Sequence, residues 1–197
     1  MGRVVLQDRD IQIIDFLKQN KCADTDTLSH IFFNSSLRSC QHRLKKLNTN
    51  GDIKAFRPDI LSKNIYYVSR KPKNYKHALK VTQFIAELYK QNIEVLKVKT
   101  PFKCGNMIAD SLIVCKVNGE AKILWLEVEL TKFFDLSKYE ELYYSRAWKD
   151  VIPDFGNIVV VSDKKVDINE KFNIIKIKTD FSNIQDLIYS LSKEVAY

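Results

Sequence analysis

The sequence predicts an α+β protein of two unlike domains, and three observations support this fold class. Apolar residues recur at helical spacing over residues 8–48, and two short β-prone runs follow them. Beyond a basic segment at residues 70–76, helical and strand-like runs alternate in the order αβββαβ. Residues 1–76 hold 15 Lys and Arg against 7 Asp and Glu, whereas residues 77–197 hold 17 of each kind, so the first segment carries the whole net charge of +8.

Three helices are expected at the start of the chain. Asp8 caps the first, over residues 8–20, and the oxygens of Asp24-Thr25-Asp26 cap the second. Asn34-Ser35-Ser36 precedes the third helix, which runs to about Asn48. Its apolar residues fall on one stripe at offsets of three and four, and we expect this stripe to face the core: Leu37, Cys40, Leu44 and Leu47.

A β-hairpin is expected after these helices. Gly51 ends the helical region, and the β-prone runs 53–56 and 65–68 flank a polar loop that holds Arg57, Pro58, Asp59 and Lys63. Three helices followed by a hairpin is the element order of the winged helix-turn-helix. We therefore predict such a DNA-binding domain at residues 1–72, bounded by the basic segment 70–76.

The second predicted domain, residues 77–197, combines a mixed β-sheet with helices on its faces. Asn118-Gly119 predicts a tight hairpin between two of its strands, because both residues accept positive φ angles. The expected elements are a helix at 77–91, strands at 94–100, 107–117 and 121–130, a helix at 135–149, strands at 158–161 and 172–177, and a helix at 183–194.

The composition restricts the class of protein. No apolar run approaches the roughly 20 residues of a membrane span, and the N-terminus has no signal-peptide core, so we expect a cytoplasmic protein. The spacing of the four cysteines matches neither a zinc site nor a disulfide framework. We interpret them as small buried thiols: Cys22, Cys40, Cys104 and Cys115.

The excess of positive charge on the first domain indicates a polyanionic partner, and the third helix presents side chains suited to the major groove of double-stranded DNA. Arg38, Gln41, His42 and Lys45 point away from the apolar stripe, with His42 included only by position. The full candidate DNA-binding set is Arg38, Ser39, Gln41, His42, Arg43, Lys45, Lys46, Lys54, Arg57 and Lys63. The alternative is a solvated face, or a domain that docks another protein.

The element order of the second domain resembles the core of PD-(D/E)XK nucleases, and three acidic residues stand where that fold places its metal ligands. Asp110, Glu127 and Glu129 are expected to approach one another and to be candidate Mg²⁺ ligands and catalytic groups. The nuclease pattern requires lysine at the position of Glu129, however. Lys132 and Lys138 are the nearest lysines that could replace it.

Together these features resemble the replication-relaxation family of plasmids, phages and integrative elements, which joins a winged helix to a degenerate restriction-endonuclease-like domain. The resemblance covers about residues 8–150. It implies a DNA-binding accessory or regulatory protein of replication, transfer or transcription control. The matching residues are Arg9-Asp10, the run 43–47, Tyr66-Tyr67-Val68, the run 77–81, Ala109-Asp110, the run 126–129 and Lys138-Tyr139.

Three functions follow as alternatives. The first is a DNA-binding protein that needs no cofactor and acts as a homodimer on an origin or operator. The second is an Mg²⁺-dependent endodeoxyribonuclease that uses Asp110, Glu127 and Glu129. The third is a protein-docking regulator that recruits a replication initiator or relaxase.

Overall fold

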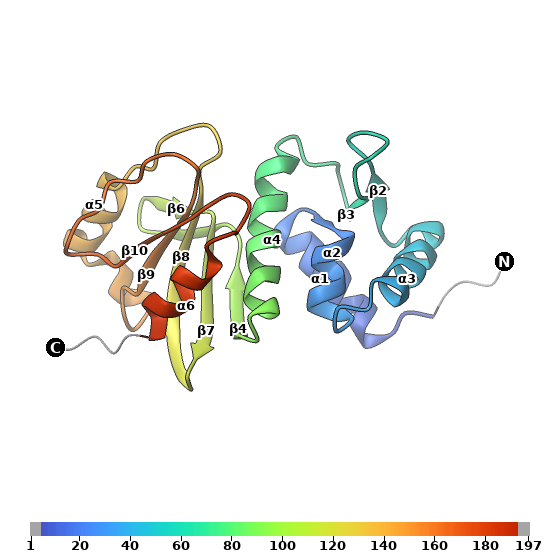
Figure 1. The fold of residues 1–197 in the computed structure, drawn as a ribbon, viewed down its shortest axis with the longest axis horizontal. Coiled ribbons are helices and arrows are strands. Elements are labelled where there is room, and N and C mark those ends of the chain that lie inside the picture. Colours follow the sequence, from blue (N-terminus) through green and yellow to red (C-terminus); the bar gives the residue numbers. More distant parts are fainter. Residues whose placement is uncertain (1–4, 193–197) are drawn as a thin grey trace. The chain divides into compact units, whose positions relative to one another are not determined.

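The computed structural model describes residues 5–192 and has an α+β fold (Figure 1). The chain forms two compact units that divide between Gln91 and Asn92. The sequence instead suggested a boundary within the basic segment 70–76. The helix after that segment packs against the elements that precede it, and this packing moves the boundary about one helix further along the chain.

The N-terminal unit consists of four helices and a small sheet of three short strands. The strand order is β1-β3-β2, with antiparallel pairing throughout. Strand β1 was not expected, because a strand of two residues has no periodicity to recognise. The elements are α1 (Asp8–Asn20), β1 (Ala23–Asp24), α2 (Thr25–Phe32), α3 (Leu37–Asn50), β2 (Lys54–Phe56), β3 (Ile65–Tyr67) and α4 (Tyr75–Lys90).

The core of this unit joins α1, α2 and α3 to the hairpin formed by β2 and β3. Cys40, Leu44 and Leu47 of α3 are fully buried and belong to one apolar cluster with Ile53 and Tyr66. The expected stripe is therefore confirmed at three of its four positions. The exception is Leu37, which is 44% exposed because it begins the helix, beyond the elements that cover the later turns.

Helix α4 is tied to the N-terminal unit by a hydrogen bond at the start of α2. Asp24 caps α2, as expected, by accepting a hydrogen bond from the backbone N–H of Thr27 at 2.8 Å. Its second carboxylate oxygen accepts a hydrogen bond from the Gln83 amide of α4, also at 2.8 Å. One carboxylate thus satisfies a helix terminus and holds the neighbouring helix.

The C-terminal unit is built around a mixed five-stranded sheet with the order β10-β9-β8-β7-β4. Strands β4, β7 and β8 are antiparallel, whereas β8, β9 and β10 are parallel. The elements are β4 (Glu94–Lys99), β5 (Phe102–Cys104), β6 (Met107–Ala109), β7 (Ser111–Val117), β8 (Glu120–Val128), α5 (Ser137–Ser145), the 3-10 helix η1 (Ala147–Asp150), β9 (Asn157–Val161), β10 (Ile174–Ile177) and α6 (Ile184–Ser192).

Strand β8 lies in the middle of the sheet, and its residues 123–128 are buried on both faces. Helix α5 packs on the face that carries Trp125, where Tyr139 and Leu142 join the main apolar cluster of the unit. Helix α6 contacts β10 and β7. Glu127, near the end of β8, is consequently buried beneath α5.

Two parts of the C-terminal unit differ from the sequence-based expectation. The expected strand at 107–117 is divided at Asp110, because β6 pairs with the short strand β5 and only β7 joins the main sheet. The expected helix at 135–149 is interrupted at Arg146, which has φ 58° and separates α5 from η1. The local β5–β6 hairpin therefore takes residues 107–109 out of the main sheet.

The local expectations for the Asn118-Gly119 hairpin and for the burial of the cysteines are confirmed. Asn118 and Gly119 have φ angles of 53° and 84° and join β7 to β8 as a tight hairpin. All four cysteines are buried free thiols. None of the helices within residues 5–192 is long and apolar enough to cross a membrane.

Candidate functional site

The basic surface of the N-terminal unit begins on α3. Arg38, Gln41, His42 and Lys45 are all exposed, on the side of the helix opposite its buried residues. Lys46 is exposed as well. The neighbouring Ser39 accepts a hydrogen bond from the Ser36 hydroxyl at 2.9 Å, at the first turn of the helix. The amphipathic character of α3 therefore leaves one whole face, rich in donors and cations, open to a ligand.

Arg43 lies apart from this exposed face, although the sequence placed it among the candidate DNA contacts. Its guanidinium binds the carboxylate of Asp10 in α1 through two nitrogens, and Nε donates at 2.8 Å. The side chains are only 15% and 0% exposed for Arg43 and Asp10. The same carboxylate accepts the backbone N–H of Gln7 at 2.7 Å and completes a capping box at the start of α1, so Gln7 with Asp10, and not Asp8 as expected, caps this helix. Arg43 thus joins two helices of the core.

The electrostatics of this pair favour the ionised carboxylate. Burial by itself raises the pKa of Asp10, but the hydrogen bonds and charge of Arg43, with the Gln7 amide, outweigh it and hold the pKa below its usual value. The pair is therefore charged at neutral pH, and the guanidinium is already engaged within the fold.

The remaining candidate cations lie on the β2–β3 hairpin. Lys54 donates to the backbone carbonyl of Ser69 at 3.3 Å, and Arg57 donates from Nε to the Asn64 side chain at 2.8 Å. Lys63 forms an ion pair with Asp26 of α2. All three cations are exposed, so their hydrogen bonds are made at the surface. Lys63 differs from the other two because a carboxylate partly balances its charge.

The sequence reading missed two aliphatic side chains in this hairpin. Ile60 and Leu61, in the loop interpreted as polar, are 91% and 96% exposed. Two adjacent aliphatic residues inside a loop rich in turn-forming residues was the signal that could have identified them. Aliphatic residues of this size are most often buried, whereas these two project together from a hairpin tip.

In the C-terminal unit, the three predicted acids gather near Tyr139 of α5. Ser111 lies opposite Leu126, so the next residues outward are Asp110 and Glu127, as the hairpin geometry suggested. The Tyr139 hydroxyl donates to Glu127 Oε1 at 2.6 Å. Burial raises the pKa of Tyr139 well above its usual value, and the charges of Glu127, Asp110 and Glu129 raise it further. All three carboxylates therefore act on one phenol.

Glu127 and Asp110 each have a further partner within the protein. Lys138 of α5 places its Nζ 2.8 Å from Glu127 Oε1, and Asp110 accepts the backbone N–H of Val128 at 2.8 Å. Lys138, and not Lys132, is therefore the lysine that reaches the acids; Lys132 is exposed. Within residues 5–192 no group of three or more His, Cys, Asp or Glu side chains is arranged to hold a metal ion.

Glu127 has the most perturbed environment of these acids. It is 3% exposed, and this burial raises its pKa to about 7, against the opposing effects of Lys138 and the Tyr139 hydrogen bond. The charge of Asp110 adds to the increase. The carboxyl group consequently exchanges its proton near neutral pH, a property common at functional sites and also found in structural ion pairs.

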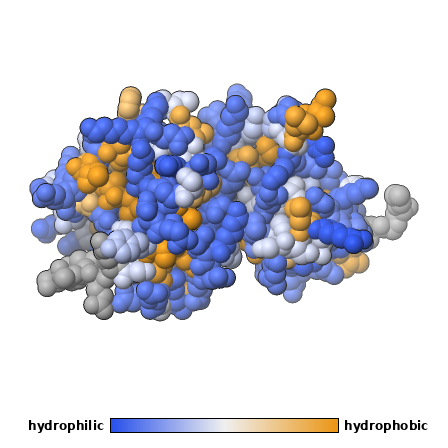
Figure 2. Space-filling view, in the orientation of Figure 1, coloured by the Kyte–Doolittle hydropathy of each residue, from blue (hydrophilic) through white to orange (hydrophobic). Residues whose placement is uncertain are grey.

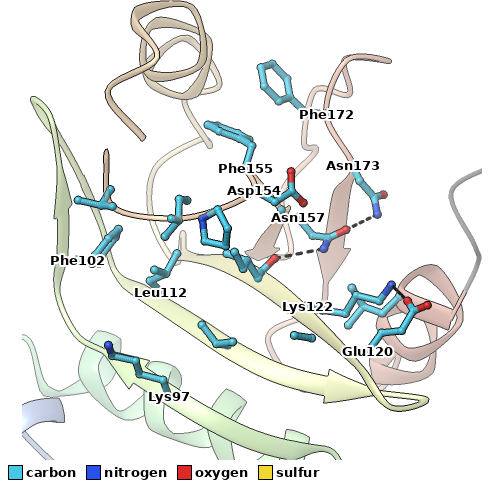
Figure 3. Close-up of a pocket in the computed structure, with 18 of the residues that line it drawn as sticks. Lys97, Phe102, Leu112, Glu120, Lys122, Asp154, Phe155, Asn157, Phe172 and Asn173 are labelled. Atoms are coloured by element: carbon cyan, nitrogen blue, oxygen red, sulfur yellow. Dashed lines mark hydrogen bonds and ion pairs between the residues drawn. The ribbon is translucent and has the colours of Figure 1, made fainter. Parts of the chain in front are cut away.

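A separate hollow of about 1040 Å³ lies against strands β4, β7 and β8 of the C-terminal unit (Figure 3). Lys97 and Leu112 stand on strands β4 and β7, and Phe155 and Asn157 face them from across the hollow. The Asn157 amide donates to the Ile123 carbonyl at 3.2 Å. The acids Asp110 and Glu127 are not among its lining residues. The hollow is therefore distinct from the acidic cluster.

Comparison with known proteins does not add a family assignment. No protein-family model, no curated protein and no solved structure matches the chain.

Proposed function

We propose that the chain is a DNA-binding protein of accessory or regulatory type, and that its N-terminal unit is a winged helix-turn-helix that contacts duplex DNA. The element order α1-β1-α2-α3-β2-β3 supports this assignment of the fold. In such a domain the helix at the position of α3 enters the major groove, and the hairpin of β2 and β3 is the wing.

The observation that carries this proposal is the exposed face of α3. Arg38 and Lys45 can donate to guanine O6 and N7, and the amide of Gln41 can pair with adenine. The opposite, apolar face of the same helix packs into the core. The donors are therefore held on a rigid element. Lys54 and Arg57 supply positive charge from the wing, where contacts to phosphates set the register on the duplex.

The proposal predicts different effects for a base-reading residue and a phosphate-binding residue. Arg38→Ala is expected to weaken binding to a selected duplex by roughly 5- to 100-fold, with a smaller loss on random duplex, because a bidentate base contact is lost. Lys54→Ala is expected to weaken both alike and to reduce the slope of log affinity against log salt by about 0.9. Fluorescence anisotropy with labelled duplexes selected from a random pool measures both quantities.

Lys165→Ala provides the matched control, because Lys165 is an exposed lysine of the C-terminal unit outside the proposed interface. It should leave affinity and salt slope unchanged. Equal losses for Arg38→Ala on selected and random duplex would contradict base reading. Absence of duplex binding by the full chain at low salt would contradict the proposed function.

One observation favours a second candidate function, metal-dependent DNA cleavage. Lys138 lies beside Glu127 and provides the positive charge that the position of Glu129 lacks. The donor set does not fit a three-carboxylate Mg²⁺ site as it stands, however, because Asp110 and Glu127 are bonded to Val128 and to Lys138 and Tyr139. We therefore derive no cleavage step from this cluster.

Supercoiled plasmid incubated with the full chain and Mg²⁺, Mn²⁺ or EDTA distinguishes the two candidates. We expect a mobility shift without nicking under all three conditions. Metal-dependent nicking that is abolished in Glu127→Gln and retained in Asp167→Ala, an exposed acid elsewhere in the same unit, would establish the second function instead.

A further inference from the structure

The tip of the β2–β3 hairpin carries an apolar wedge, defined here as Ile60 and Leu61. We propose that this wedge enters the minor groove of duplex DNA and partly unstacks a base step, so that the bound DNA bends. This inference rests on the proposed function and adds a second contact, chemically different from that of α3. Aliphatic side chains inserted between base pairs are a known means of bending a duplex.

The first support is the exposure of the wedge. Ile60 and Leu61 are the two most exposed large apolar side chains of the described residues, at 91% and 96%. Figure 2 shows an orange projection at the position that the β2–β3 tip occupies in Figure 1. Nothing in the folded N-terminal unit covers these side chains, so the apolar area is available to a ligand.

The second support is that the tip has a defined conformation. The Asp59 carboxylate accepts hydrogen bonds from the backbone N–H of Leu61 at 3.0 Å and of Ser62 at 2.8 Å. It also accepts the Ser62 hydroxyl. These bonds close the turn on its polar side and leave the two aliphatic side chains pointing outward. A wedge held in this way loses little conformational entropy when it binds.

The third support is the charge on either side of the wedge. Arg57 precedes it and Lys63 follows it, and both are exposed, with the charge of Lys63 partly balanced by Asp26. Arg57 uses Nε for Asn64, which leaves its terminal nitrogens for a phosphate. The minor groove is about 6 Å wide and is bordered by two phosphate backbones, so an apolar tip between two cations matches it.

The fourth support is the fixed relation between the wedge and α3. Leu44 and Leu47 of α3 share one buried cluster with Ile53 and Tyr66, which stand at the base of the hairpin. The base of the hairpin that carries the wedge is therefore fixed to α3. When α3 lies in the major groove, a hairpin attached to its side is positioned to reach the neighbouring minor groove.

The test compares the double variant Ile60→Ser/Leu61→Ser with the control Ile168→Ser, which replaces a 78% exposed isoleucine of the C-terminal unit. Exposed substitutions of this kind hardly change stability. The probes are duplexes that carry 2-aminopurine at successive positions, which brightens when unstacked, and duplexes end-labelled for energy transfer. The DNA is selected from a random pool by the full chain.

We expect the wild-type chain and the control to brighten 2-aminopurine at one step and to shorten the end-to-end distance. The double variant should lose both signals and bind about 10-fold more weakly, with an unchanged salt slope because it retains its cations. Wild-type binding without a 2-aminopurine signal would overturn the wedge and leave the proposed function standing. Absence of any wild-type binding would overturn both.

A lipid surface is the other chemistry that an aliphatic tip with flanking cations can recognise. Sedimentation with vesicles of phosphatidylserine and phosphatidylcholine separates the two ligands. One contrary outcome is a double variant that keeps the full 2-aminopurine and energy-transfer signals but loses vesicle binding that the wild type shows. That result would overturn the proposal that the wedge enters DNA. No vesicle binding by the wild-type chain agrees with the proposal.

Discussion

Replacement of Asp10 by alanine is expected to lower the free energy of unfolding of the N-terminal unit by about 3–5 kcal/mol at pH 7. The substitution leaves the Arg43 guanidinium, whose side chain is 15% exposed, without its carboxylate. It also removes the capping bond to the Gln7 amide. Hydrogen exchange of the α1 and α3 amides measures the effect. Tryptophan fluorescence is unsuitable here, because both tryptophans, Trp125 and Trp148, lie in the other unit and report only on that unit.

Asp15→Ala is the matched control for this prediction. It removes an aspartate from the same helix and breaks an ion pair with Lys18, but both side chains are more than half exposed. We expect a loss below about 1 kcal/mol, because exposed pairs contribute little. Losses of similar size for the two variants would show that the buried pair has no special role.

The pH dependence of the Asp10 contribution has a definite sign. The pKa of Asp10 in the folded chain lies below its ordinary value of 3.8. The stabilisation is therefore complete above pH 3.8 and is lost as the pH falls through the lower, folded-state value. The difference in the free energy of unfolding between the wild type and Asp10→Ala should therefore disappear only in acid.

The same pair decides how Arg43 acts. We expect Arg43→Ala to destabilise α1 and α3, and to leave duplex affinity unchanged per folded molecule, because its guanidinium is engaged by Asp10. A stable Arg43→Ala chain with weakened DNA binding would restore Arg43 to the interface that the sequence suggested.

Glu127 should make the C-terminal unit less stable as the pH rises from 5 to 8. Its pKa is about 7 in the folded chain and 4.5 in the ordinary state, so the folded state binds the extra proton. This contribution is complete below pH 4.5 and disappears above pH 7. A pKa shift of that size corresponds to about 3 kcal/mol in the free energy of unfolding.

Glu127→Gln should remove this pH dependence, because glutamine resembles the protonated acid and can still accept the Tyr139 hydrogen bond. We expect the variant to be more stable than wild type at pH 8 and similar to it at pH 5. Urea unfolding followed by tryptophan fluorescence is suited to the measurement, since Trp125 contacts Tyr139. Lys138, at 28% side-chain exposure, can turn to solvent when its partner becomes neutral.

Glu120→Gln is the control on the same strand, because Glu120 is 65% exposed and bonded to Lys122 at the surface. It should follow the wild-type pH profile. If Glu127→Gln were less stable than wild type at pH 8, the ion pair with Lys138 would outweigh the cost of burial. Stabilisation of the wild type by Mg²⁺ at pH 8, absent in Glu127→Gln, would favour the metal-dependent function.

Local chemistry explains the features that were predicted correctly from the sequence. The burial of Cys40, Leu44 and Leu47, the cap at Asp24 and the Asn118-Gly119 hairpin each depend on residues within a few positions of one another. The exposed cations of α3 follow from the same periodicity, because the face opposite an apolar stripe must face solvent.

The sequence by itself determined the α+β class, the mixed sheet, the faces of α3 and the approach of Asp110 to Glu127. The tertiary structure alone decided that Arg43 binds Asp10, that Lys138 is the lysine beside Glu127, and that α4 packs with the first unit. Periodicity records which face of an element is buried. It does not record the partner that buries it, and Arg43 and Asp10 are separated by 33 residues of chain.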